Sequence, residues 1–81
     1  MELVFSEKFD RNLREAPSSI QGAFWKQANF LLKDMRHPSL RAKKYIEEEN
    51  VWQARVNKDW RFYFKIFEGK YYLLKIVKHP K

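Results

Sequence analysis

Three side chains in the last third of the sequence have the types that phosphate chemistry requires: Arg55, Arg61 and His79. Arginine stays protonated and can hold two phosphate oxygens at once with its planar guanidinium group. Histidine, whose reference pKa is about 6.5, can both donate and accept a proton near neutral pH. Together, these residue types can bind a phosphodiester and transfer the protons that its cleavage requires.

RNA suits this set of residues, because its own 2′-hydroxyl can attack the neighbouring phosphate. The reaction needs a proton acceptor, cations for the crowded phosphorane and a proton donor for the leaving 5′-oxygen, and it needs no metal. The sequence contains no H-x-E, C-x-x-C, G-x-G-x-x-G or Walker motif, which argues against zinc enzymes and nucleotide hydrolases. We therefore expect no metal and no cofactor. The other histidine, His37, precedes a proline, and we interpret it as a C-terminal helix cap.

The two arginines lie in stretches whose side chains alternate between apolar and polar, the pattern of half-buried strands. The predicted strands are residues 51–57 and 60–67, joined by a turn at 57–59. A three-residue turn places Arg55 directly opposite Arg61, an unfavourable arrangement that indicates a bound anion. The alternative is that both side chains extend into water. The other face of these strands is apolar and carries Trp52, Ala54, Val56, Trp60, Phe62 and Phe64.

A third strand is predicted at residues 71–78, after a three-residue turn at 68–70. This turn places Leu74 opposite Phe64, whereas a two-residue turn would direct Lys75 into the core. We expect Tyr63, Lys65 and Lys75 to contact RNA. With the three-residue turn, one polar face gathers Arg55, Arg61, Tyr63, Lys65, Lys75 and His79.

Two helices are predicted to cover the apolar face of this sheet. The segment ELVFS favours a short N-terminal strand, and Ser6 can cap a first helix that stops before Ala16-Pro17. Ser18 and Gln21 fit the capping box of a second helix, which is predicted to end near Arg36-His37-Pro38. Its apolar residues recur every three or four positions at Ile20, Phe24, Ala28, Leu31 and Met35.

The segment SLRAKKYIEEEN, residues 39–50, has no clear period and is predicted to be a loop. The predicted element order is therefore β-α-α-β-β-β. It describes an α+β fold in which a helical hairpin packs on one face of an antiparallel sheet. The length favours one domain, residues 1–81.

The charge of the chain is concentrated at its C-terminal end. Residues 51–81 contain eight Lys/Arg and two Asp/Glu, so they carry +6 of the net charge of +7. Such a surface attracts polyanions, with nucleic acid and acidic protein segments among them. Cysteine is absent, and neither a membrane-spanning run nor a signal peptide is indicated, so we expect a cytoplasmic protein.

The whole sequence resembles toxins of the RelE/ParE superfamily, which belong to type II toxin–antitoxin systems. The resemblance depends on the order of three segments: LLKDMRHPSLRAKKY, VWQARVNKDWRFYFKI and YYLLKIVKHPK. It implies an endonuclease that cleaves mRNA on the ribosome and is held inactive by a cognate antitoxin. The alternatives are a gyrase-inhibiting member of the superfamily without catalysis, or a basic RNA-binding module that does not cleave.

The resemblance also implies roles for individual residues. Arg61 matches the arginine that binds the scissile phosphate, and His79 matches a candidate general acid or base at the end of the last strand. Arg55 matches a basic position that contacts phosphate, and Lys43 and Lys44 match lysines that contact RNA. The sequence departs from many RNA-cleaving relatives after the histidine, where Pro80 and Lys81 replace an aromatic residue.

Overall fold

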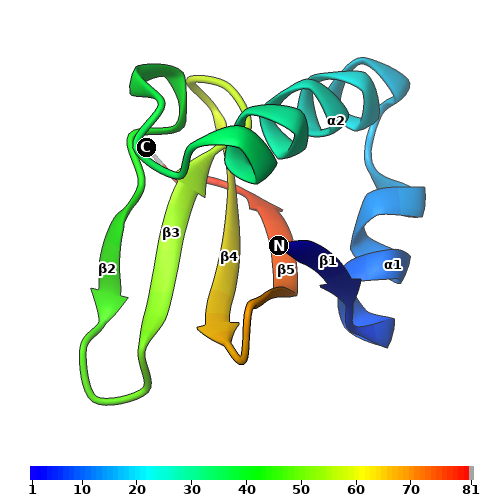
Figure 1. Ribbon diagram of the computed structural model, residues 1–81. Coiled ribbons are helices and arrows are strands. Elements are labelled where there is room, and N and C mark those ends of the chain that lie inside the picture. Colours follow the sequence, from blue (N-terminus) through cyan, green and yellow to red (C-terminus); the bar gives the residue numbers. More distant parts are fainter. Residues whose placement is uncertain (81) are drawn as a thin grey trace.

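The computed structural model describes residues 1–80 and shows two α-helices packed against a five-stranded sheet (Figure 1). Its elements are β1 (Glu2–Phe5), α1 (Glu7–Glu15), α2 (Ser18–Lys33), the 3-10 helix η1 (Pro38–Leu40), β2 (Lys43–Ile46), β3 (Val51–Arg55), β4 (Trp60–Phe67) and β5 (Lys70–Lys78). The strand order is β1-β5-β4-β3-β2, with β1 parallel to β5 and the other neighbours antiparallel. The predicted α+β fold is confirmed, although the sheet is mixed and has one more strand than expected. No helix within residues 1–80 is long and apolar enough to cross a membrane.

The N-termini of the two helices are stabilised in different ways. Helix α1 begins as predicted, because the Ser6 hydroxyl accepts a hydrogen bond from the Phe9 backbone amide at 3.0 Å. The predicted capping box of α2 is wrong, since Pro17 occupies the N-cap position and no side chain caps this end. The Gln21 side chain instead reaches back and donates to the Ala16 carbonyl at 3.0 Å. This bond fixes the short connection between the helices.

Helix α2 ends at Lys33, about one turn before the end that the sequence predicts. The carboxylate of Asp34 accepts the backbone amide two residues further on at 2.9 Å, which favours a turn over another helical residue. The interpretation of His37 as a cap of α2 is wrong. Its Nδ1 accepts the Ser39 backbone amide at 3.2 Å and so caps η1, while its ring stacks on Phe30 with 3.8 Å between centroids.

The core lies between the helices and one face of the sheet. Phe24 of α2 meets Phe62 of β4 edge to face, with 5.4 Å between ring centroids, and both side chains are fully buried. The predicted apolar face is confirmed, because Ala54, Val56 and Phe64 are buried in the same cluster. The opposite face of the sheet is not covered by the helices (Figure 1), and we call it the open face.

The pairing of β3 with β4 follows the predicted register, with Arg55 directly opposite Arg61. The turn between these strands is stabilised by Asn57, whose side-chain oxygen accepts the backbone amides of Asp59 at 2.8 Å and Trp60 at 2.9 Å. Asparagine favours turns because its side chain can replace a backbone acceptor in this way. The alternation of the two strands therefore places both arginines on the open face.

The turn between β4 and β5 differs from the prediction. It contains two residues, Glu68 and Gly69, and Phe67 pairs with Lys70 across it. Both turn residues have positive φ, 48° and 73°, as the tight two-residue hairpin turn requires. The turn predicted at residues 68–70 is therefore one residue too long.

A β-bulge in β5 compensates for the shorter turn. Tyr63 pairs with Lys75, but Phe64 pairs with Leu73, so Leu74 is an extra residue without a partner in the register. The predicted pairing of Leu74 with Phe64 is wrong for this reason. Because one inserted residue reverses the alternation, Lys75 stays on the open face despite the two-residue turn.

Part of the predicted loop forms the edge strand β2. Its pairing with β3 contains a second bulge, since Lys44 pairs with Trp52 and Ile46 pairs with Val51. Tyr45 lies between these pairs as the extra residue. The bulge interrupts the alternation of polar and apolar residues, which explains why the sequence shows no strand pattern here.

Candidate active site

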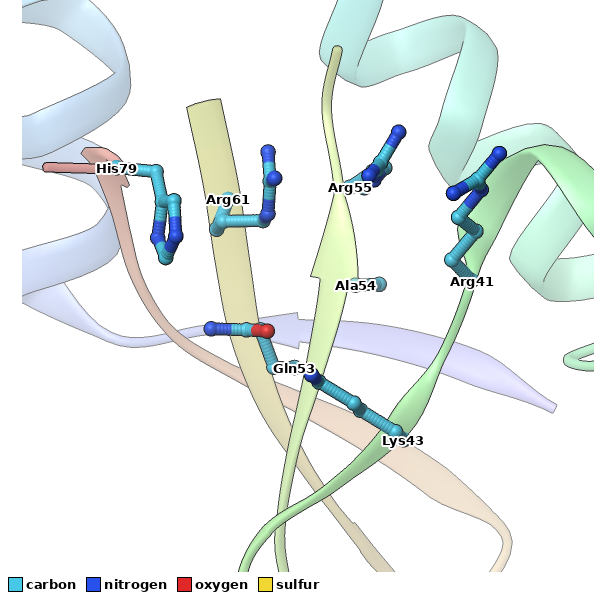
Figure 2. A pocket seen from close by; sticks show the side chains of 7 residues that line it. All are labelled: Arg41, Lys43, Gln53, Ala54, Arg55, Arg61 and His79. Carbon is cyan, nitrogen blue, oxygen red and sulfur yellow. The ribbon is translucent and has the colours of Figure 1, made fainter. Parts of the chain in front are cut away.

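A basic cavity of about 290 Å³ lies at one end of the open face (Figure 2). Four of its side chains form a row: His79 directly after β5, Arg61 from β4, Arg55 from β3 and Arg41 from the segment before β2. Of the residues predicted to act on RNA, Arg55, Arg61, His79 and Lys43 are brought together here. The lining consists of Arg41, Lys43, Gln53, Ala54, Arg55, Arg61 and His79, without a carboxylate.

Arg61 is buried, with 8% of its surface exposed. Its Nη1 donates to two carbonyl oxygens of the β3–β4 turn, Asn57 at 2.8 Å and Lys58 at 3.2 Å, and to that of Trp60 at the start of β4 at 3.0 Å. The alternative that both arginines extend into water is therefore wrong for Arg61. These bonds fix the guanidinium group at the cavity before any ligand binds.

Arg55 lies opposite Arg61 in a strongly positive environment. Partial burial lowers the pKa of Arg55, and the charges of Arg41 and Arg61 lower it further. Like charges on facing strands repel each other, so this grouping of arginines is electrostatically unfavourable by itself. A bound anion would relieve this repulsion.

The buried side chain of Gln27 holds the main chain around the cavity in place. Its Nε2 donates to the carbonyls of Ser39 at 3.0 Å and Arg55 at 2.9 Å, and its Oε1 accepts the Ser39 hydroxyl at 3.1 Å. These bonds join α2 to the end of β3 and to η1. The segment that carries Arg41 follows η1 directly, so one amide side chain positions two walls of the cavity.

His79 is positioned through its backbone. Its amide donates to the Asp59 carbonyl at 2.6 Å, which attaches the residue after β5 to the β3–β4 turn. The same turn accepts two of the hydrogen bonds of Arg61. The predicted proximity of His79 and Arg61 is thus a consequence of one shared turn.

The lining includes two residues that the sequence interpretation missed, Arg41 and Gln53. Arg41 has a left-handed backbone, with φ of 45°, and it reaches the cavity only because β2 pairs with β3. No local pattern indicates this placement. Gln53 has the same strand parity as Arg55, and this signal could have identified it.

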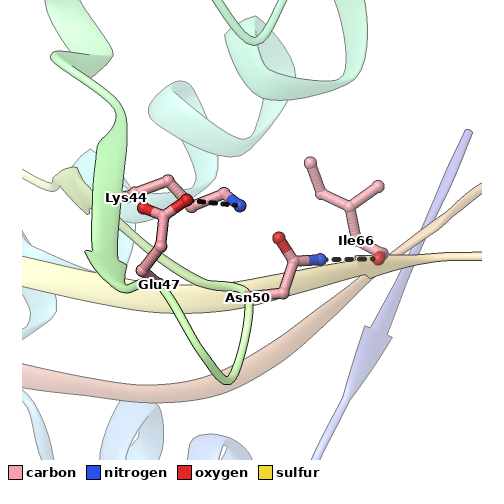
Figure 3. A network of polar contacts seen from close by, with 4 residues as sticks. All are labelled: Lys44, Glu47, Asn50 and Ile66. Atoms are coloured by element: carbon pink, nitrogen blue, oxygen red, sulfur yellow. Dashed lines mark hydrogen bonds and ion pairs between the residues drawn. The ribbon is translucent and has the colours of Figure 1, made fainter.

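Two of the predicted RNA contacts lie outside the cavity. Lys44 is on the opposite face from Lys43, with its Nζ 5.3 Å from the Trp52 ring centre and 3.9 Å from the Glu47 carboxylate (Figure 3). Lys65 follows Arg61 by four residues on β4, about 13 Å along the strand, and lines a separate hollow with Asn50 and Ile66. Asn50 donates to the Ile66 carbonyl at 3.4 Å there (Figure 3).

Two other predicted contacts, Tyr63 and Lys75, also do not line the cavity, but they lie next to each other on the open face. Lys75 places its Nζ 4.8 Å from the centre of the Tyr63 ring, across the β4–β5 pair. The Tyr63 hydroxyl accepts a hydrogen bond from Gln53 Nε2 at 2.9 Å. Gln53 therefore connects this aromatic residue to the cavity that it lines.

The described residues offer no obvious metal centre. Across residues 1–80, no group of three or more His, Asp or Glu side chains could hold an ion. The polar groups of the cavity are mainly N–H donors of arginine and lysine, which are suited to phosphate oxygens.

No family model and no curated protein sequence matches this chain. Solved structures of low identity do match it. A YoeB/ParE toxin from Agrobacterium tumefaciens has a TM-score of 0.80 at 9% identity, covering 99% of this chain and 100% of that one. YafQ from Escherichia coli strain BL21(DE3) has a TM-score of 0.77 at 11% identity, covering 94% and 90%.

A toxin–antitoxin complex, RelBE2 from Mycobacterium tuberculosis, matches with a TM-score of 0.76 at 18% identity, covering 96% of both chains. All three similarities extend over nearly the full length of this chain. They compare folds, since the identities are far too low to compare individual residues. The chain therefore has the RelE/ParE-like toxin fold, as the resemblance of its sequence implies.

Proposed function

We propose that this protein is the toxin of a toxin–antitoxin pair and that it inhibits translation by cleaving mRNA on the ribosome. The observation that supports the proposal best is the basic cavity, in which three arginines surround a space that a histidine also borders. Its volume of about 290 Å³ is sufficient for a phosphate and part of its ribose. The toxin fold of the matched structures supports the same class of function.

The proposed reaction is a transfer within the RNA itself. The 2′-hydroxyl loses its proton and attacks the adjacent phosphorus, the bond from phosphorus to the 5′-oxygen breaks, and the leaving oxygen takes up a proton. The products are a 2′,3′-cyclic phosphate and a free 5′-hydroxyl. His79 borders the cavity and is our candidate for one of the two proton transfers.

The arginines supply charge to the transition state. The phosphorane gains negative charge as the new bond forms, and fixed cations stabilise it more than they stabilise the bound substrate. Arg61 is held in advance by its three carbonyl acceptors, so no reorganisation is needed when the charge develops. Because Nη1 makes these bonds, we assign phosphate binding to the Nε and Nη2 groups of Arg61, together with Arg55.

The cognate antitoxin is the proposed protein partner. Residues 51–81 carry a net charge of +6, so a segment that covers the cavity should be acidic where it meets Arg55 and Arg61. RelBE2, one of the matched structures, is a complex of a toxin with its antitoxin. The proposed function places the protein in the cytoplasm, where ribosomes are found.

Sequencing the 5′ ends of cellular mRNA after brief induction tests the proposal. We expect new ends within coding regions that appear within minutes, keep the reading frame of translation and are absent from untranslated RNA. Growth arrest without new mRNA ends would contradict RNA cleavage and favour the gyrase-inhibiting alternative. Neither arrest nor new ends would favour the non-cleaving RNA-binding module.

A further inference from the structure

Tyr45 is an exposed aromatic side chain beside the basic cavity. It has 52% of its surface exposed, although it lies on a strand of the sheet. Its ring meets the ring of Tyr63 at 63°, with 4.9 Å between centroids. The pair forms an aromatic surface on the open face, and the Tyr45 part of this surface is open to solvent.

Tyr45 lies on the open face whether or not β2 is regular, and the bulge in β2 brings Ile46 to the same face. Regular alternation from Lys43 and Lys44 would place residue 45 on the open face, and residue 46 on the helix side. Because Tyr45 is the extra residue, Ile46 pairs with Val51 on the open face as well. Bulges of this kind are frequent beside functional sites.

The surroundings of the two tyrosines are those of a nucleotide subsite. Lys75 lies 4.8 Å from the Tyr63 ring, and Gln53 holds the Tyr63 hydroxyl at 2.9 Å. Gln53 also lines the basic cavity, so the aromatic surface and the cavity share a wall (Figure 2). Tyr63 is two residues from Arg61 on β4, about 7 Å along the strand, a separation that one extended nucleotide can span.

We propose that Tyr45 stacks on the nucleobase next to the phosphate held in the basic cavity. The inference rests on the proposed function, because it assigns a base-binding subsite to the same RNA substrate. Exposed aromatic rings bind single-stranded RNA bases by stacking, while adjacent cations bind the backbone. Tyr63 is nearly fully buried, with 5% exposed, and supports Tyr45 from behind.

Binding of two fluorescently labelled oligonucleotides tests the inference without any need for cleavage. One probe is a short single-stranded 2′-O-methyl RNA of mixed sequence, and the other has the same backbone without bases. We expect the wild type to prefer the probe with bases. Tyr45→Ala should weaken binding of that probe by about tenfold and leave the probe without bases unchanged, because only stacking is lost.

Two matched variants control for side effects. Tyr45→Phe keeps the aromatic ring and should bind both probes as the wild type does. Phe67→Ala removes another exposed aromatic residue, 61% exposed at the far end of β4, and should also bind as the wild type does. A thermal melt of each variant confirms that the fold is retained.

Three results would overturn the inference: no preference of the wild type for bases, equal binding by Tyr45→Ala and the wild type, or equal weakening of both probes. These outcomes are separate from the proposed function. A wild type that prefers bases but cuts no mRNA would support the subsite and contradict cleavage. A wild type that cuts mRNA, together with unchanged oligonucleotide binding by Tyr45→Ala, would support cleavage and contradict the subsite.

Discussion

The two facing arginines, which have the same charge, are held in different ways. Arg61 is buried and donates to three carbonyls in and directly after the β3–β4 turn. Arg55 is half-buried, and this burial together with the charges of Arg41 and Arg61 lowers its pKa. Arg61 therefore has a structural role in addition to its proposed role in phosphate binding. The sequence pattern alone assigns both residues to a solvated polar face, because it cannot show that a guanidinium group will turn back onto its own turn.

This difference predicts unequal effects on stability. Arg61→Ala should lower the free energy of unfolding by about 1.5–3 kcal/mol, because it removes hydrogen bonds donated by a charged group. Arg55→Ala should change it by no more than about 0.5 kcal/mol, as is usual for surface substitutions. Urea unfolding of both variants measures the two values. A loss of no more than about 0.5 kcal/mol for Arg61→Ala would show that the turn does not depend on Arg61.

The register of β3 and β4 was predicted correctly, whereas the two bulges of the sheet were not predicted. The β3–β4 register follows from alternation on both sides of a turn that Asn57 stabilises, and all of this information is local. The bulges at Tyr45 and Leu74 leave no such local signal, because an extra residue is accommodated by tertiary pairing. Lys75 was nonetheless placed on the correct face, since the short turn and the bulge compensate for each other.

The sequence predicted those residues of the candidate site that lie on β3 and β4 or directly after β5. Arg55, Arg61 and His79 were found from strand parity and residue type, and the cavity contains all three. Arg41 was missed because its place depends on the pairing of an irregular edge strand. Lys44 was assigned to the RNA contacts from the loop that the resemblance implies, but as a strand residue it lies on the opposite face from Lys43.

Gln27 connects α2 to η1 and β3, so its loss should weaken the contacts among all three elements. Gln27→Ala leaves the carbonyl of Arg55 without its donor, and a buried polar group without a partner costs about 1–3 kcal/mol. We expect a loss of stability of this size in urea unfolding. Gln21→Ala is the matched control, because its side-chain bonds lie at the start of α2, and it should cost about 1 kcal/mol or less. A harmless Gln27→Ala would contradict the role of this side chain.

For the molecule as a whole, a buried tyrosine contributes to the dependence of folding stability on alkaline pH. Burial raises the pKa of Tyr71, and the negative charge of Asp34 raises it further. The unfolded chain loses this proton near pH 10, while the folded protein retains it to higher pH. The unfolded state therefore binds fewer protons above about pH 10, and stability falls as the pH rises through this range.

Tyr71→Phe should remove this part of the alkaline loss. Between about pH 9 and pH 11, the melting temperature of the variant should fall less than that of the wild type. Tyr45→Phe, which replaces an exposed tyrosine, should follow the wild type. If the melting temperatures of Tyr71→Phe and the wild type fall equally over this pH range, the Tyr71 hydroxyl does not contribute to the alkaline loss of stability.

Single-turnover cleavage of mRNA on purified ribosomes tests the proposed chemistry most directly, with Arg55 and His79 as the residues to change. Arg55 is preferable to Arg61 here, because its side chain does not hold the β3–β4 turn. Lys8→Ala, on the exposed side of α1, is the control for a change of one charge elsewhere.

The wild type and Lys8→Ala should cleave at the same rate. His79→Ala should be slower by about 10²–10⁴-fold, as expected for the loss of one proton transfer. Arg55→Ala should be slower by about 10²–10³-fold, as expected for the loss of one fixed group that stabilises the developing charge. Circular dichroism should show all three variants folded. Full activity in folded His79→Ala and Arg55→Ala, or no cleavage by the wild type, would contradict the assignment of the basic cavity as an RNA-cleaving site.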